Sequence, residues 1–178
     1  MKLLKGVLLV FAGLFVFITL ISLLIPSKIA ITRAVSIKGD SAQIFKQIAD
    51  VIQWKNWHPV FADATINATY SNTPGTVGST ISWVTNGKQN TLVVEKIAYP
   101  IVSLSLQRSG EKSIDNILSV TPVQEQGDYQ VQWQSTTHLK WYPWDKFSGI
   151  FVEKLTGAGY EDALNALKKY IETPNKVN

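Results

Sequence analysis

The sequence GYEDALNALKKYIE, residues 159–172, decides how the rest of the chain is expected to fold. Its apolar positions recur at spacings of four, three and four, which places them along one face of a helix. These positions are Tyr160, Leu164, Leu167 and Ile171. An isolated helix of this length is marginal in water, so the apolar face needs a partner. We expect that partner to be a curved antiparallel sheet formed by most of the preceding chain, with the functional site between sheet and helix.

The strand expected over residues 129–141 has the clearest alternation in the chain. Mostly apolar side chains fall on one face and polar ones on the other, which is typical of an antiparallel sheet covered on one side only. The covered face is expected to carry Tyr129, Val131, Trp133, Ser135, Thr137, Leu139 and Trp141.

Six further strands are expected upstream, at residues 29–37, 64–70, 77–85, 91–97, 101–107 and 113–123. Asn86-Gly87 is a strong hairpin signal between two of them, because both residues tolerate positive φ. Two short helical segments follow the first strand. One covers residues 42–52, and the next places Trp54 and Trp57 on one face before Pro59 ends it.

The residues before the C-terminal helix form a second apolar stripe with a different phase. If the chain continued as one helix at about 100° per residue, this stripe would lie on the side opposite the stripe of residues 160–171. The stripe consists of Phe147, Ile150, Phe151 and Leu155. One straight helix cannot bury both stripes in one groove, so we predict two helices separated at Gly157-Ala158-Gly159. The first is expected to cover an end of the sheet as a lid, and the second to lie along its concave face.

Residues 6–25 form an uncharged apolar run. As a helix this run is about 30 Å long, which matches the hydrocarbon core of a bilayer. A cleaved secretory signal is the alternative, but the run exceeds the usual length and no small-x-small site follows it. We therefore expect a transmembrane anchor over residues 1–27 and one folded domain over residues 28–174. Lys2 and Lys5 favour a cytoplasmic N-terminus and an extracytoplasmic domain.

The charge of the chain excludes some partners. The formal net charge is +4, but the basic residues are interspersed with 13 acidic residues and form no cluster. Nucleic acid binding by a basic face is therefore not expected. The chain has no cysteine, which excludes disulfides and thiol chemistry.

No catalytic or metal-binding constellation is legible in the sequence. His58 and His138 are far apart and have no carboxylate at ligand spacing, so neither metal nor cofactor is expected. The carboxylates expected nearest the cavity rim are Glu95, Asp115 and Glu153, and for each a surface role is favoured over acid–base catalysis. No catalytic residue is assigned.

Several short motifs, in this order along the chain, resemble a known superfamily. The motifs are Pro26-Ser27-Lys28, Ile44-Phe45 with Ile48-Ala49-Asp50, Trp54-Lys55-Asn56-Trp57, Thr73-Pro74-Gly75 with Val77-Gly78, Phe147 to Leu155, and Gly159 to Leu167. Together they resemble the START-like helix-grip (SRPBCC) superfamily. Within it, the chain looks like the bacterial polyketide cyclase/dehydrase and lipid-transport proteins that carry one N-terminal membrane helix.

The resemblance implies an α+β helix-grip fold, in which a curved seven-stranded antiparallel sheet surrounds a C-terminal helix in the order β-α-α-β6-α. It also implies a habit of holding apolar molecules between sheet and helix. It implies no particular reaction, because members include enzymes, carriers and receptors.

Trp83, Trp133 and Trp141 fall on the expected inward faces of their strands, and together they exceed what is needed to cover a single helix, which favours an apolar cavity. Ser135 and Thr137 are candidate polar contacts, and strand parity leaves open whether Ser103 and Ser105 also face inward. The cavity wall is expected to comprise Trp54, Trp57, Phe61, Trp83, Val102, Leu104, Leu106, Leu118, Val131, Trp133, Phe151, Leu155 and Leu164.

Three functions are compatible with such a chain. The first is a membrane-tethered domain that binds a lipid-like or other apolar small molecule. The second is a cyclase, dehydrase or hydrolase acting on an apolar substrate. The third is a module with a filled core that docks a protein partner. The first is preferred, because the sequence shows no acid–base pair.

Overall fold

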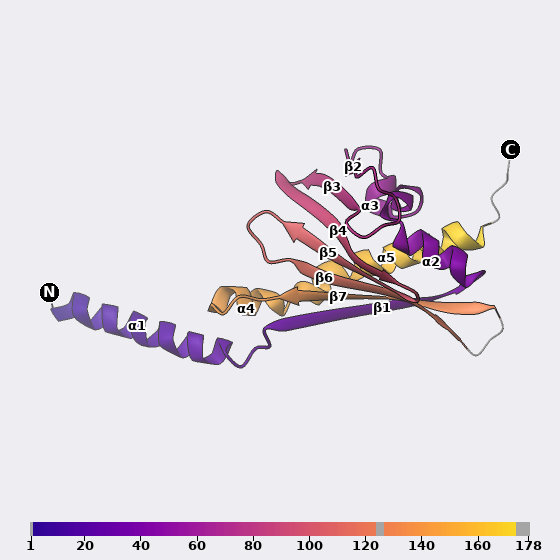
Figure 1. Ribbon diagram of the computed structural model, residues 1–178. Coiled ribbons are helices and arrows are strands. Elements are labelled where there is room, and N and C mark those ends of the chain that lie inside the picture. Colours follow the sequence, from indigo (N-terminus) through magenta and orange to yellow (C-terminus); the bar gives the residue numbers. More distant parts are fainter. Residues whose placement is uncertain (1, 124–126, 174–178) are drawn as a thin grey trace.

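The computed structural model describes residues 2–123 and 127–173 as a seven-stranded antiparallel sheet with helices on one side of it (Figure 1). Met1 and the predicted domain end at residue 174 lie outside the described residues. The strands follow the order β1-β7-β6-β5-β4-β3-β2. Their bounds are β1 Lys28–Lys38, β2 Thr69–Tyr70, β3 Thr80–Thr85, β4 Lys88–Ala98, β5 Ile101–Arg108, β6 Ile114–Pro122 and β7 Asp128–His138.

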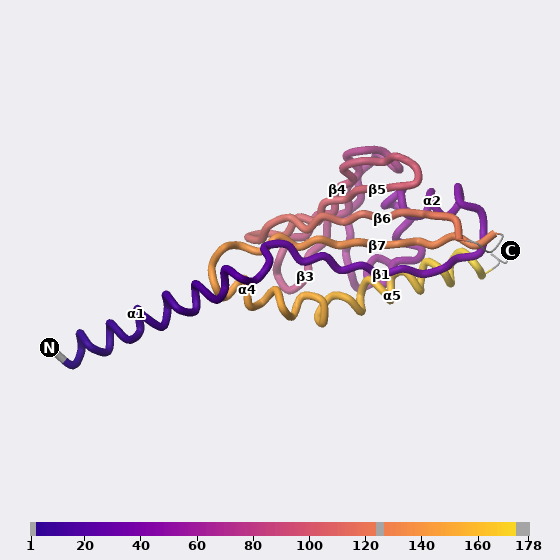
Figure 2. Tube along the Cα trace, turned by 90° about the horizontal axis from the view of Figure 1, so that it is seen from below, coloured from indigo at the N-terminus to yellow at the C-terminus, as the bar shows by residue number. Residues whose placement is uncertain are grey.

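The helices enclose one face of this sheet and extend from one end of it. Their bounds are α1 Lys2–Ser22, α2 Ser41–Ala49, the 3₁₀-helix η1 Val51–Asn56, α3 Pro59–Ala62, α4 Pro143–Gly149 and α5 Val152–Glu172. Figure 2 shows α5 along one face of the sheet and α1 projecting beyond its end. The predicted α+β helix-grip architecture is confirmed.

Local chemistry fixes the strand pairing where the sequence indicated it. Asn86 and Gly87 both have positive φ, 53° and 73°, and Thr85 pairs with Lys88 in the hairpin that they close. The first strand β1 pairs along its whole length with the last strand β7, so segments far apart in the sequence lie side by side in the sheet.

The core lies between the concave face of the sheet and α5. Ala163, Leu164 and Leu167 of α5 are buried there, as the helical spacing predicts. Val131, Trp133 and Ser135 of β7 are also buried, in agreement with the predicted alternation. Trp141 departs from it: β7 ends at His138, and the Trp141 side chain is 68% exposed.

The C-terminal region does consist of two helices, but the predicted position of the break is wrong. Helix α5 runs without interruption through Gly157-Ala158-Gly159, and the chain turns instead at Ile150 and Phe151. Glycine lowers helix propensity without ending a helix that tertiary contacts hold. At Gly157 the missing side chain leaves room for Arg33, whose guanidinium lies 2.6 Å from where a Cβ atom would be.

The first helix packs at an end of the sheet as predicted, because Gly149 lies against Ile29 and Leu139, but the predicted inward face is wrong. The side chains of the predicted stripe are exposed rather than buried against the sheet, and they are Phe147, Ile150, Phe151 and Leu155. The face of α4 that packs inward carries Pro143, Lys146 and Gly149 instead. That choice depends on tertiary contacts that helical periodicity does not reveal.

Two further predicted elements have different bounds from those expected. The strand at residues 64–70 is reduced to β2, because Asp63 holds a turn by accepting hydrogen bonds from Thr65. Helix α1 ends at Ser22, so residues 23–25 of the apolar run lie beyond it. Its Leu3–Ser22 segment is long and apolar enough to cross a membrane.

Candidate functional site

The short helices after α2 hold two tryptophan side chains against the core. The Asp50 carboxylate accepts the Ile52 amide at 3.1 Å and begins η1. The Trp54 indole N–H donates to the Ile48 carbonyl and the Trp57 indole N–H to the Gln47 carbonyl, each at 3.3 Å. Because both N–H groups are satisfied by the protein, the rings present only their apolar surfaces to their surroundings.

A cavity of about 270 Å³ lies between the sheet, η1, α3 and α5. Most of its wall is aromatic or aliphatic, and its rim includes the exposed side chains of Val60 and Leu155. The wall consists of Trp54, His58, Val60, Phe61, Trp83, Leu92, Leu106, Arg108, Asn116, Trp133, Leu155, Thr156, Gly159 and Tyr160.

The aromatic rings of the wall contact one another in a continuous series. Trp133 lies 5.4 Å from Trp54 and 5.1 Å from Tyr160, measured between ring centroids. Phe61 packs edge-on against Trp83 at 5.0 Å. These contacts link η1, α3, β3, β7 and α5, so the shape of the cavity is fixed by elements far apart in the sequence.

His58 is the one imidazole in this wall. Its ring is stacked on Trp54 with an interplanar angle of 6° and lies 4.8 Å from Phe61. Burial lowers the pKa of His58 to about 4, so the ring is neutral at pH 7. Its Nδ1 accepts the Val60 amide at 3.3 Å, which leaves the proton on Nε2 and caps α3.

The polar groups of the wall are largely committed to partners within the protein. The Trp133 indole N–H donates to Asn116 Oδ1 at 3.0 Å. The Tyr160 and Ser135 hydroxyls are 2.8 Å apart. An apolar molecule in the cavity therefore leaves these buried polar groups satisfied.

A second hollow of about 360 Å³ adjoins the first and shares Arg108, Thr156 and Tyr160 with it. It lies between the β5–β6 connection, the end of β7 and the start of α5, and its wall is more polar. Lys112, Lys140, Glu111 and Asp145 are among its residues.

The predicted cavity residues fall into three groups. Trp54, Phe61, Trp83, Leu106, Trp133 and Leu155 lie in the cavity wall. Six others are buried in the core without lining the cavity, and they are Trp57, Val102, Leu104, Leu118, Val131 and Leu164. Phe151 does neither, because its side chain is 57% exposed near the junction of α4 and α5.

The polar candidates divide in the same way. Ser135 contacts Tyr160 in the wall, whereas Thr137 lines the second hollow. Ser103 and Ser105 alternate with the core residues of β5 and so occupy its other face. The sequence did not predict Arg108, Asn116 and Tyr160 as wall residues. It also assigned no functional role to His58, which lies in the wall.

The candidate carboxylates lie outside this cavity. Glu95 is exposed, Glu153 pairs with Arg33 at 3.3 Å, and Asp115 lies 2.7 Å from His138 Nε2. Within residues 2–123 and 127–173, no group of three His, Cys, Asp or Glu side chains is arranged to hold a metal ion.

Comparison with known proteins places this fold in a family. The family profile described as "Polyketide cyclase / dehydrase and lipid transport" matches residues 28–172. The chain therefore belongs to the polyketide cyclase/dehydrase and lipid-transport family. No curated protein matches it in sequence.

Solved structures with the same fold are distant in sequence. A START superfamily protein from Mycobacterium smegmatis is 17% identical with a TM-score of 0.60, over 80% of this chain and 97% of that one. A Thermobifida fusca protein is 17% identical with a TM-score of 0.61, over 79% and 92%. An uncharacterised Bacillus thuringiensis protein is also 17% identical, with a TM-score of 0.58, over 80% and 98%. At this identity the likeness extends to the fold alone.

Proposed function

We propose that this protein is a membrane-tethered domain that binds a lipid-like or other apolar small molecule between its sheet and α5. The family description names both lipid transport and cyclase or dehydrase activity. The observation that carries the proposal is the aromatic cavity, whose indole N–H groups at Trp54 and Trp133 are satisfied by the protein. Such a wall favours a ligand that makes few hydrogen bonds.

The size and surroundings of the cavity narrow the class of ligand. A volume of about 270 Å³ is at the small end of small-molecule pockets and suits one ring system or one acyl segment. The adjoining polar hollow offers a place for a polar group on the same molecule, next to Arg108. A neutral His58 contributes one N–H donor without placing a charge in the apolar wall.

The tether is proposed from α1. Its Leu3–Ser22 segment is uncharged except for Lys5, and most of its large apolar side chains are exposed along the helix. Leaving them in water is unfavourable, whereas a bilayer accommodates them. We propose that residues 1–27 anchor the protein and that the domain lies on the extracytoplasmic side, in keeping with Lys2 and Lys5.

The two alternative functions have less support. Glu95, Asp115 and Glu153 lie outside the cavity wall, so no carboxylate pair is available there for acid–base catalysis. The presence of a cavity weighs against a completely filled core.

The test places a larger side chain into the cavity at a position on α5. A Cβ atom at Gly159 meets no heavy atom within 4 Å, and Gly159 lies in the cavity wall. Gly159→Leu therefore begins an apolar side chain in open space at the cavity wall. The neighbouring Ala158→Leu is the matched control, because Ala158 is exposed and lies outside that wall.

The measurement is a fluorescence titration of the full chain in mild detergent with the apolar probe N-phenyl-1-naphthylamine. We expect Gly159→Leu to weaken probe binding by roughly tenfold or more, because the site loses volume, and Ala158→Leu to leave it unchanged. Equal binding by all three proteins would refute the cavity as the binding site. Mass spectrometry of small molecules that copurify with the wild type then identifies the ligand.

A further inference from the structure

Helix α4 has its apolar side chains on the outside. The residues that pack inward are Pro143, Lys146 and Gly149. On the outside, Trp144 is 65% exposed and Phe151 57% exposed. Phe147 and Leu155 are exposed as well, so α4, its junction with α5 and the first turn of α5 carry an exposed apolar stripe of these four side chains. A soluble helix normally shows the reverse arrangement.

Specific contacts hold α4 in this orientation. A Cβ atom at Gly149 would press against Leu139 Cδ1 and lie 2.7 Å from Ile29 Cδ1, so a larger residue there would force these side chains to shift. Lys146 is only 3% exposed, and its Nζ donates to the Ile25 carbonyl at 2.8 Å and to Ser27 Oγ at 2.6 Å. These contacts turn the apolar stripe away from the domain.

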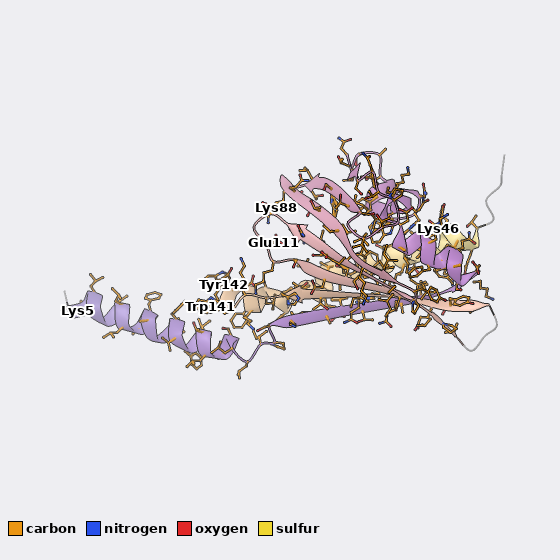
Figure 3. All side chains as sticks on the ribbon, in the orientation of Figure 1. Lys5, Lys46, Lys88, Glu111, Trp141 and Tyr142 are labelled. Atoms are coloured by element: carbon orange, nitrogen blue, oxygen red, sulfur yellow. The ribbon has the colours of Figure 1, made fainter. Side chains whose placement is uncertain are left out.

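The same contacts place the stripe beside the end of the anchor helix. Ile25 and Ser27 lie in the short connection between α1 and β1, and α4 contacts α1 directly. Figure 3 shows Trp141 and Tyr142 at the end of the domain that adjoins α1, with Lys46 at the far end. If α1 spans a bilayer, its Ser22 end lies at one surface of that bilayer, and α4 lies at the same level.

The composition of the exposed surface fits the interface of a bilayer. Tyr142 stacks on Trp144 at 4.6 Å, and Trp141 packs edge-on against Tyr142 at 6.0 Å. Tryptophan and tyrosine are enriched at the level of lipid headgroups, and helices with one apolar face lie in that layer. Leu23 and Leu24, which follow α1, are exposed at the same junction and continue the apolar surface.

We infer that α4 and the first turn of α5 lie in the interfacial layer of the membrane that α1 spans, with the stripe Trp144, Phe147, Phe151 and Leu155 in contact with lipid. This inference rests on the proposed tether. It adds a consequence for the ligand, because Leu155 ends the stripe and also forms part of the cavity rim. An apolar molecule therefore has a continuous apolar surface between bilayer and cavity.

The test uses the full chain in vesicles of phosphatidylcholine and phosphatidylglycerol whose acyl chains are brominated near the headgroup. Bromine quenches nearby tryptophans on contact. We expect the wild type to lose more emission than the Trp141→Phe/Trp144→Phe double variant, with the quenched fraction differing roughly twofold. The double variant keeps Trp54, Trp57, Trp83 and Trp133, so it also reports any quenching by brominated lipid inside the cavity.

Two outcomes would overturn the inference. One is equal quenching of the wild type and the double variant. The other is that the apolar stripe contacts a second copy of this chain instead of lipid. A Trp144→Cys variant detects such a contact, because the chain has no other cysteine. Disulfide-linked dimers of this variant at every protein-to-lipid ratio would assign the surface to self-association.

The proposed function fails in different ways. A chain that does not float with vesicles has no tether, and the docking of α4 is rejected with it. A chain that floats and binds N-phenyl-1-naphthylamine, but shows no quenching that depends on Trp141 and Trp144, rejects the docking alone. Quenching of that kind in a chain that binds no probe supports the docking and rejects the cavity function.

Discussion

His58 illustrates how the environment of one side chain sets its chemistry. The imidazole is enclosed by Trp54, Trp57, Phe61 and Trp133, and no carboxylate pairs with it among the described residues. Protonation would place an unpaired positive charge among aromatic rings, which is why burial lowers its pKa to about 4. A neutral His58 keeps the cavity suited to apolar ligands at pH 7.

This lowered pKa predicts a loss of stability in mild acid. The unfolded chain takes up a proton at His58 as the pH falls through 6.5, whereas the folded protein does not until about 4. Stability from this group is therefore complete above pH 6.5 and declines as the pH falls toward 4. The full effect is roughly 3 kcal/mol, from 1.36 kcal/mol for each pKa unit.

The measurement compares the wild type with His58→Asn by denaturant unfolding in detergent across this pH range, followed by tryptophan emission. Asn does not titrate and still offers an acceptor to the Val60 amide at the start of α3. We expect the wild type to lose more stability than the variant as the pH is lowered. Parallel curves would show that His58 does not remain neutral.

At the scale of elements, the glycines of α4 and α5 have different roles although they lie within eleven positions. Gly149 permits the contact of α4 with Leu139 and Ile29, Gly157 leaves room for Arg33, and Gly159 adjoins open space at the cavity. A substitution at each position therefore has its own expected sign.

Gly149→Ala and Gly159→Ala form a matched pair. The first forces a methyl group against Leu139 and Ile29, and we expect it to destabilise the protein by about 1–3 kcal/mol. The second meets nothing and improves helix propensity, so we expect a gain of about 0.5–1 kcal/mol. Thermal unfolding followed by circular dichroism in detergent measures both. A Gly149→Ala protein as stable as the wild type would contradict the close packing of α4.

The same elements show which features of the fold could be predicted from the sequence and which depend on contacts between distant residues. Alternation in β7 and the turn at Asn86-Gly87 are local signals, so the sheet and its hairpin were predictable. Which face of α4 packs inward depends on contacts of Gly149 and Lys146 with distant residues. Helical spacing identifies the apolar stripe but not what the stripe contacts, so Phe151 was wrongly expected in the cavity. Alternation does not show where β7 ends, so Trp141 was wrongly expected in the core.

The cavity itself was predictable only in part. The alternation of side chains identified the inward face of β7, but it left that of β5 open and did not show which inward residues the helix covers. Leu164 and Leu167 fill the space at one part of α5, whereas Gly159 and Tyr160 leave it open at another. Val102, Leu104 and Val131 therefore lie in the core, while Leu106 and Trp133 lie in the cavity wall.

At the scale of the whole molecule, α1 and α4 lie at the same end of the protein (Figure 1), and the cavity rim includes Leu155 in the first turn of α5, which follows α4. Lys146 joins the first two, because it is the buried group that connects α4 to the chain just after α1. A flexible connection would let the domain take many orientations above a membrane. Two hydrogen bonds from one buried ammonium group restrict that freedom.

Lys146→Met tests whether this connection sets the orientation of the domain. Methionine keeps most of the aliphatic stem but donates no hydrogen bond, so the Ile25 carbonyl and Ser27 hydroxyl lose their partner. We expect a loss of about 1–3 kcal/mol in stability. We also expect less quenching of emission by brominated lipid, because α4 is no longer held at the bilayer surface. Lys169→Met is the matched control, since it removes the same charge from an exposed position on α5 far from its first turn. If the two variants lose the same stability and quench alike, Lys146 does not orient the domain, and the apolar stripe alone must hold α4 against the membrane.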